Sequence, residues 1–253
     1  MGGLTVLAEL REVLPDAPVI YAADLAGLPY GTKTEAEVAA RVCGLLGRMA
    51  ERYRPRLICI ACNTASTIAL GMVRDVLEIP IVGTVPAIKP AAKLTQTGVI
   101  GLLGTAATVR QPYVDRLEQQ FAADAVLLRC AAPALVDLAE AKIAGRAIAL
   151  DDVRRAAAGL LDAPRGGEID TVVLACTHFP LLEEELAQIF GPQVRFVHGA
   201  EGIARQIAAL TDGQPFARAC PDRAIVTGDS GASGMEPVRK HLKKYGLDQL
   251  DQF

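Results

Sequence analysis

The stretch Leu57-Ile-Cys-Ile-Ala-Cys62-Asn63-Thr64 decides the fold, because Val172-Val-Leu-Ala-Cys176-Thr177-His178 repeats its pattern later in the chain. Each stretch is a short apolar run that ends in Ala-Cys and continues into small polar residues. A run that is apolar at every position is typical of a strand buried on both faces of a parallel sheet. Open α/β sheets bind their ligands at the carboxyl ends of the strands. The repeat therefore predicts a parallel α/β fold with Cys62 and Cys176 at strand ends that face a ligand.

Two cysteines in matched positions suit one kind of chemistry, the inversion of a carbon centre. Inversion needs a base on one face of the carbon and an acid on the other, and a thiolate and a thiol can exchange these roles in each turnover. A free cysteine has a pKa of about 8.5, so modest tuning ionises it near neutral pH. The alternative is that both are small core residues, as free cysteines often are. The polar residues that follow both strands favour the catalytic interpretation.

Composition limits the class of protein. The chain has 253 residues, is 51% hydrophobic, contains no Trp and carries a net charge of −3, which suits one large or two medium domains. No basic patch indicates a nucleic-acid partner, and no apolar run approaches the roughly 20 residues that span a bilayer. Six cysteines, several of them inside apolar runs, do not form a disulfide framework. With no signal peptide at its start, we expect a cytoplasmic protein without a membrane partner.

Strand and helix patterns alternate along the chain, which predicts a parallel sheet with right-handed crossovers. Thr34-Glu-Ala-Glu37 is a capping-box pattern that starts one helix, and Asp151 is expected to cap another. We therefore expect two similar lobes, each a parallel-sheet βα sandwich, with one cysteine from each lobe facing the cleft between them. Besides the two cysteine runs, the expected strands cover 19–23, 81–85, 98–103, 125–128, 194–197 and 224–227, and the expected helices 4–14, 34–52, 65–77, 109–121, 133–144, 151–161, 181–189, 201–211 and a closing helix.

Two motifs carry a resemblance to a known family. Ala61-Cys-Asn-Thr-Ala-Ser66 and Ala175-Cys-Thr-His-Phe-Pro-Leu-Leu182 resemble the paired cysteine signatures of the aspartate/glutamate racemases. These two motifs are highly specific, and the similarity covers nearly the whole chain. Segments that also match but would be weak alone are Gly2–Leu7, Leu28–Gly31, Ile100–Thr105 and Val226–Asp229.

The resemblance implies a racemase that interconverts L- and D-glutamate without pyridoxal phosphate or a metal, with Cys62 and Cys176 as the two acid/bases. It further implies that the product D-glutamate supplies bacterial cell-wall peptidoglycan, with aspartate as the near alternative substrate. It also implies a discontinuous first lobe of residues 1–90 and 200–253, with 91–199 as the second lobe. We expect glutamate to be the small-molecule partner of a homodimer.

Further site residues follow from position and from the resemblance. His178, two residues beyond Cys176, is expected to raise the thiolate fraction of that cysteine or to protonate the substrate. Asp24, at a strand end, is a weaker candidate beside the site, and Glu140 is either a substrate contact or an exposed helix charge. The expected substrate-binding residues are Pro29, Tyr30, Gly31, Asn63, Thr64, Thr105, Thr108, Thr177 and Glu140, whereas Cys43, Cys59, Cys130 and Cys220 are expected to be structural.

Other classes of protein remain open. A decarboxylase of related fold needs only one cysteine of the pair, so the presence of two argues against it. A structural zinc protein could use Cys59, Cys62, Cys176 and His178, but residues three apart in a strand point to opposite faces.

The start of the sequence departs from the family. The family begins with a strand and Asp-Ser-Gly-x-Gly-Gly, whereas this sequence opens at Met1-Gly2-Gly3. We expect a first strand and its Asp-Ser pair to be missing, which would unpair the neighbouring strand edges and uncover apolar surface. Low stability, weak activity or a binding-only homologue would follow. A second departure is Val197-His198-Gly199, which stands where the family usually has Asp-Ser after a late strand.

Overall fold

Helices and strands alternate along the chain, and the first element is helix α1 (Leu4–Val13). The computed structural model describes residues 1–218, 221–228 and 235–253, so Cys220 and Asp229 lie outside the described residues. The strands are β1 (Ile20–Ala23), β2 (Ile58–Ile60), β3 (Ile81–Gly83), β4 (Val99–Gly104), β5 (Val126–Ala131), β6 (Thr171–Ala175), β7 (Arg195–Val197), β8 (Arg223–Val226) and β9 (Gln249–Gln252). The other α-helices are α2 (Glu35–Tyr53), α3 (Asn63–Val76), α4 (Ile88–Leu94), α5 (Ala106–Val109), α6 (Pro112–Phe121), α7 (Ala134–Ile143), α8 (Leu150–Leu161), α9 (Glu183–Phe190), α10 (Ala200–Leu210) and α12 (Glu236–Lys243).

The strands form three ladders in the described part of the chain, and each pairing in them is parallel, as the sequence predicts. Their orders are β1-β8-β9, β2-β3 and β5-β4-β6-β7. Strands β4 and β6 are buried at every position. Helices cover both faces of such strands, which is why these runs are apolar without alternation.

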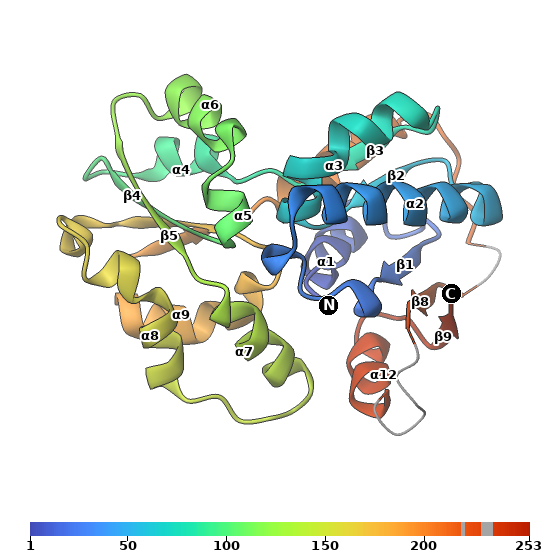
Figure 1. The fold of residues 1–253 in the computed structure, drawn as a ribbon. Coiled ribbons are helices and arrows are strands. Elements are labelled where there is room, and N and C mark those ends of the chain that lie inside the picture. Colours follow the sequence, from blue (N-terminus) through green and yellow to red (C-terminus); the bar gives the residue numbers. More distant parts are fainter. Residues whose placement is uncertain (219–220, 229–234) are drawn as a thin grey trace.

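The elements fall into two groups that Figure 1 shows side by side. We call β1–β3, β8 and β9 with α1–α3, α10 and α12 the first lobe, and β4–β7 with α4–α9 the second lobe. The first lobe joins early and late segments, because β1 pairs with β8. Helix α4 packs on β6 and α6 and therefore belongs to the second lobe. The boundary between the lobes, which the sequence predicted at residue 90, falls inside this helix. The amino end of the chain lies where the two groups meet (Figure 1).

Several helix boundaries differ from the sequence-based prediction. The capping box at Thr34 and Glu37 is present. Asp151, however, does not cap its helix: α8 begins at Leu150, and Asp151 lies in the first turn, where a carboxylate stabilises the helix dipole. The helix expected over 109–121 is two helices, α5 and α6, and Pro112 begins the second of them.

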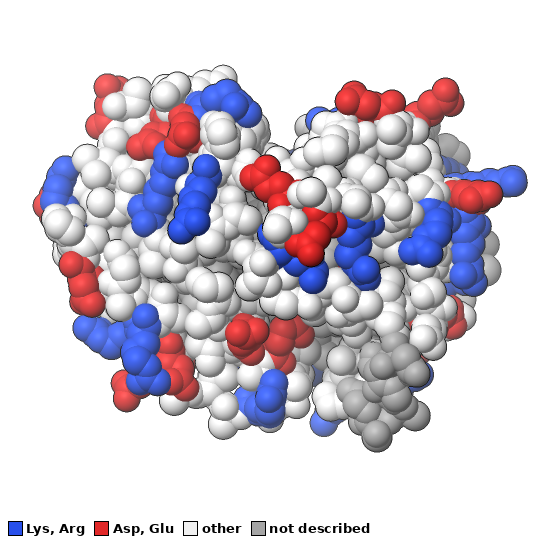
Figure 2. Space-filling view, viewed as in Figure 1, with Lys and Arg blue, Asp and Glu red and all other residues white. Residues whose placement is uncertain are grey.

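Strand β9 was not predicted, because its polar residues resemble a loop and only pairing with β8 makes it a strand. No helix in the described ranges is both long and apolar enough to cross a bilayer. On the face shown in Figure 2, acidic and basic side chains interleave around a notch between the lobes.

Candidate active site

Cys62 lies between the end of β2 and the start of α3, where it is the N-cap residue. Its sulfur accepts a hydrogen bond from the Ala65 N–H at 3.5 Å. Burial raises the pKa of the Cys62 thiol, while the N–H groups of Ala65 and Thr64 act in the opposite direction. The start of a helix is a position that favours a thiolate, because the free N–H groups and the helix dipole stabilise negative charge. The local fold therefore supports Cys62 as a base.

Cys176 follows β6 and is 7% exposed. Burial above all, together with negative charge on Cys62, raises the pKa of this thiol to about 12. The two sulfurs, one from each lobe, are thus within electrostatic reach of one another. Two such groups resist ionising together, because each thiolate disfavours a second. A pair held as one thiol and one thiolate is the state that a two-base proton transfer requires.

His178 connects Cys176 to Glu140. The His178 Nδ1 lies 3.9 Å from the Cys176 sulfur, and its Nε2 lies 2.7 Å from Glu140 Oε1. A carboxylate is a strong acceptor, so Glu140 favours the tautomer with the proton on Nε2, in which Nδ1 faces the sulfur as an acceptor. The Gly2 N–H donates to Nε2 at 3.1 Å, and the Met1 amino group lies 3.0 Å from Nε2 and 2.5 Å from Glu140 Oε1, so these two groups favour the opposite tautomer.

The charges of this pair follow from its surroundings. Burial lowers the pKa of His178, although Glu140 acts in the opposite direction, so the ring is neutral at pH 7. Burial alone would raise the pKa of Glu140, but hydrogen bonds from His178 and Met1 lower it to about 2. Glu140 is therefore an ionised carboxylate that orients a neutral imidazole toward Cys176. Of the two interpretations of Glu140, the exposed helix charge is wrong, because its carboxylate is held in this pair.

Three threonine hydroxyls bridge the lobes beside the cysteines. Thr64 at the start of α3 lies 2.9 Å from Thr105 and 3.3 Å from Thr108, oxygen to oxygen. Thr105 and Thr108 lie 3.1 Å apart at the start of α5. A further bridge joins the cysteine strands, because the Thr177 hydroxyl donates to the Ala61 carbonyl at 3.2 Å. The residues that the sequence placed after each cysteine therefore meet across the lobe junction.

Asn63 presents an unused acceptor. The residue is 4% exposed, and within the described chain its Oδ1 has no hydrogen-bond partner. A buried polar atom without a partner costs free energy, of the order of 1–3 kcal/mol, so its presence calls for a ligand that donates. An ammonium group is such a donor.

The loop that carries Pro29, Tyr30 and Gly31 borders the site. The Tyr30 hydroxyl donates to Asp24 Oδ2 at 2.6 Å, and Arg41 donates to both Asp24 oxygens at 2.5 Å each. The Thr227 hydroxyl donates to Asp24 as well. Burial raises the pKa of Asp24, but these hydrogen bonds outweigh it and hold the pKa below its ordinary value. Asp24 is thus an ionised clamp on the loop.

The partners of this clamp could not be found from sequence. The position of Asp24 after an apolar strand indicated a role, and Thr227 lies in the weakly matching segment Val226–Asp229, but nothing in the sequence joined Asp24 to Thr227 or to Arg41. The clamp also determines where the loop meets the second lobe: a Cβ at Gly31 would lie 2.9 Å from the side chain of Thr105. The loop can approach the lobe junction this closely because position 31 has no side chain.

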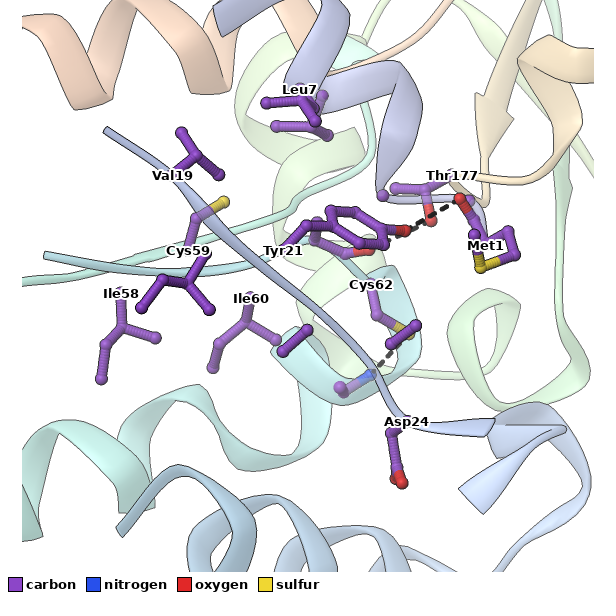
Figure 3. Close-up of a pocket in the computed structure, with 18 of the residues that line it drawn as sticks. Met1, Leu7, Val19, Tyr21, Asp24, Ile58, Cys59, Ile60, Cys62 and Thr177 are labelled. Atoms are coloured by element: carbon purple, nitrogen blue, oxygen red, sulfur yellow. Dashed lines mark hydrogen bonds between the residues drawn. The ribbon is translucent and has the colours of Figure 1, made fainter. Parts of the chain in front are cut away.

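A cavity of about 790 Å³ contains both cysteines. Figure 3 shows Cys62 and Thr177 at one end of it, with Met1 beside them. Thr108 and Glu140 are not among its lining residues and contact Thr105 and His178 from behind. The other predicted residues line it, namely Pro29, Tyr30, Gly31, Cys62, Asn63, Thr64, Thr105, Cys176, Thr177 and His178.

The zinc interpretation finds no support in the fold. Cys59 packs with α1 and α10, whereas Cys62 packs with α2 and α3. The two therefore lie on opposite sides of the β2 segment, as the spacing predicts. Among the described residues, no three His, Cys, Asp or Glu side chains are grouped in a way that would hold a metal ion.

Replacing Asp24 by asparagine is expected to raise the KM for substrate about tenfold and to change kcat less. The reason is that hydrogen bonds to a charged group contribute about 1.5–3 kcal/mol each, and their loss frees Tyr30 and the loop. Steady-state kinetics measures both constants. Glu51→Gln, an exposed charge change on α2, the helix that carries Arg41, is the control and should leave KM unchanged. An unaltered KM in Asp24→Asn would show that the clamp does not position the loop.

The sequence and the fold are shared with a known group of enzymes. The sequence model of the Asp/Glu/Hydantoin racemase family matches residues 5–207. The chain belongs to this family.

The relatives described here are glutamate racemases. The glutamate racemase of Sphingopyxis alaskensis is 61% identical over 99% of this chain and 93% of its own length. That of Salmonella typhimurium is 41% identical over 100% of this chain and 89% of its own length. Among solved structures, Escherichia coli glutamate racemase with L-glutamate and the activator UDP-MurNAc-ala has a TM-score of 0.91 at 39% identity, covering 100% of this chain and 94% of that one.

Proposed function

We propose that this chain interconverts L- and D-glutamate by moving the α-proton between Cys62 and Cys176. The observation that carries the proposal is the placement of two thiols, one from each lobe, in one cavity and within electrostatic reach of one another. The glutamate racemases among its relatives support glutamate over aspartate as the substrate. The presence of both thiols supports catalysis over binding alone and over a one-cysteine decarboxylase.

In the proposed step, one thiolate removes the α-proton, so the Cα–H bond breaks and an S–H bond forms. The electron pair passes into the adjacent carboxylate as negative charge. The opposite thiol then gives its proton to the other face of Cα and becomes the thiolate for the reverse reaction. The charges balance, and each turnover exchanges the roles of the two cysteines. His178, oriented by Glu140, supports the ionisation of Cys176 alone.

The surrounding groups suit the two charged ends of an amino acid. The hydroxyls of Thr64, Thr105 and Thr177 can donate to the substrate carboxylate, where negative charge develops. The free Asn63 Oδ1 can accept from the substrate ammonium. Thr108 acts through Thr105, and the loop at Pro29, Tyr30 and Gly31 excludes water, which makes a thiolate a stronger base.

The wider assignments rest on the family. We propose that residues 1–90 with 200–253 move as one lobe against 91–199, and that the enzyme is a cytoplasmic homodimer. The D-glutamate that it forms would supply peptidoglycan synthesis in the cell wall. The discontinuous first lobe is supported by the pairing of β1 with β8.

Incubation in D2O tests the proposal directly. Either enantiomer of glutamate should lose its α-proton signal in NMR while the optical rotation decays to zero, because each product proton comes from a solvent-exchanged thiol. Aspartate in a parallel incubation should react far more slowly. Retention of the α-proton and of the optical rotation by both glutamate enantiomers would refute the proposal, and faster turnover of aspartate would refute the choice of substrate.

A further inference from the structure

Arginine and aromatic side chains gather where the carboxyl end of α2 meets β8 and β9. The arginine patch, as it is named here, consists of Arg48, Arg52, Tyr53, Arg54, Arg223 and Phe253. Figure 2 shows basic side chains over this end of α2, away from the notch between the lobes. Arg48, Arg52 and Phe253 do not line the cavity that contains the cysteines. The patch is therefore a surface feature that the proton transfer does not use.

Two aromatic rings hold the arginines in place. The rings of Tyr53 and Phe253 lie 6.2 Å apart, centroid to centroid, and both pack against a buried apolar cluster of the first lobe. The guanidinium groups of Arg48 and Arg52 lie 5.6 and 5.5 Å from the centroid of Phe253, and that of Arg223 lies 5.8 Å from the centroid of Tyr53. An arginine held on a ring loses less conformational freedom when it binds an anion.

Carboxylates do not neutralise this patch. Arginines elsewhere in the described chain bind carboxylates, as Arg41 binds Asp24. Within the described residues, by contrast, the patch arginines of α2 and its cap make no ion pair, and Arg223 has only a 3.9 Å contact with Asp251. Glu51 is exposed on the same turn of α2 without an ion pair to them. A chain with a net charge of −3 thus presents a local excess of positive charge.

The backbone at Arg54 indicates that its side chain is retained for a purpose other than folding. Arg54 caps α2 in the left-handed conformation, with φ of 46° and ψ of 54°. Glycine is the usual residue at such a position, because a Cβ is strained there. The capping bond runs from the Arg54 N–H to the Ala50 carbonyl at 2.9 Å, and glycine would make the same bond. Strained residues other than glycine concentrate at functional sites.

The chemistry of the patch favours one class of partner. The N–H edges of a guanidinium bind phosphate or carboxylate oxygens in pairs, and its planar face stacks on nucleic-acid bases. Arg48 and Arg52 are exposed, so both edges and planes are accessible. An acidic peptide would use the edges alone, and a duplex would offer phosphates but keep its bases stacked inside. A single strand offers phosphates and unstacked bases together.

We propose that the arginine patch binds single-stranded nucleic acid, with phosphates at the guanidinium edges and bases against the guanidinium and Tyr53 planes. Arg223 and Phe253 are far from α2 in sequence, which is why no basic patch was evident from the sequence. The same groups occur in single-stranded RNA and DNA, so the patch accepts both. The inference does not depend on the racemase assignment.

Binding of a labelled oligonucleotide to the 253-residue chain tests the proposal. The probes are fluorescein-labelled oligouridylate and oligothymidylate of about twelve nucleotides, and fluorescence anisotropy is the measurement. Both should bind saturably at low salt. The slope of log K against log salt should lie between about −1.5 and −3, for two to four arginines at about −0.7 each. Absence of binding, equal binding of a duplex, or displacement by polyglutamate as effective as by unlabelled oligouridylate would overturn the proposal.

Variants locate the binding on the surface. Arg52→Gln should weaken binding several-fold and make the salt slope shallower by about 0.7. Arg52→Lys keeps the charge without the fork and plane, so its affinity should be intermediate. Arg154→Gln, at an exposed arginine on α8 in the second lobe, is the control and should bind as the unmodified chain does. Arg52→Gln that binds as tightly as this control would refute the patch.

Arg54→Gly separates a role in binding from a role in folding. Because glycine relieves the left-handed strain, this variant should unfold at a temperature a few degrees higher. It should nevertheless bind oligouridylate several-fold more weakly, since the guanidinium is lost. Glutamate racemisation should be unchanged in each of these variants. An Arg54→Gly chain that is less stable, or that binds as tightly as before, would contradict the role assigned to Arg54.

Discussion

Cys62→Ser and Cys176→Ser are each expected to lower glutamate racemisation about 10²- to 10⁴-fold, the range for loss of a general acid or base. A hydroxyl at either position is too weakly acidic to be a base near neutral pH, and each turnover needs both groups. The measurement is the decay of optical rotation from either enantiomer. The effect should be equally severe in both variants, because the reaction runs through both sulfurs in either direction.

The control for this pair is Cys43→Ser. Cys43 is a free cysteine on α2 that does not line the cavity, so its loss should leave turnover unchanged. Circular dichroism of all three variants separates loss of chemistry from loss of fold. If either Cys62→Ser or Cys176→Ser retains near-native turnover while folded, the two-base assignment is wrong.

His178→Asn is expected to slow α-proton exchange with solvent unequally from the two enantiomers. The His178 Nδ1 faces the Cys176 sulfur at 3.9 Å, and the fold gives Cys62 a helix start instead of a histidine. Exchange from the enantiomer that Cys176 deprotonates should therefore slow more. Ratios of kcat/KM cannot show this, since the equilibrium between enantiomers holds them near one. Initial exchange rates in D2O, measured separately from L- and D-glutamate, can.

The dependence on pH gives a second readout of the same variant. Burial raises the pKa of both thiols, so below that pKa the thiolate fraction grows as the pH rises. Burial lowers the pKa of His178, so its neutral form, which can accept a proton, persists down to a lower pH than usual. Exchange by the unmodified chain should rise from pH 6 to 9. In His178→Asn the rise should begin at higher pH for one enantiomer only.

Two further variants are compared with His178→Asn. Glu140→Gln should reproduce the asymmetry to a smaller extent, because the amide still contacts the imidazole but no longer carries charge. His198→Asn, at a histidine after β7 that does not line the cavity, should change neither enantiomer. Equal slowing from both enantiomers in His178→Asn would contradict its assignment to Cys176.

The sequence alone was sufficient wherever a local physical rule decides structure. Continuous apolar runs before Cys62 and Cys176 predicted buried parallel strands, and the Thr34 pattern predicted a capped helix start, because strand burial and capping depend on neighbours within a few residues. The position of the two cysteines after strands then led to the chemistry. Even the opposite orientation of Cys59 follows from the two-residue period of a strand.

The tertiary structure alone decided which distant groups meet. Three sets of contacts join segments that are far apart in sequence, so no local pattern encodes them. They are the hydrogen bonds of Arg41 and Thr227 to Asp24, of Thr64 to Thr105 and of His178 to Glu140. Residues 249–252 form strand β9 because they pair with the edge of β8. The pairing of a strand edge depends on what the whole chain places beside it.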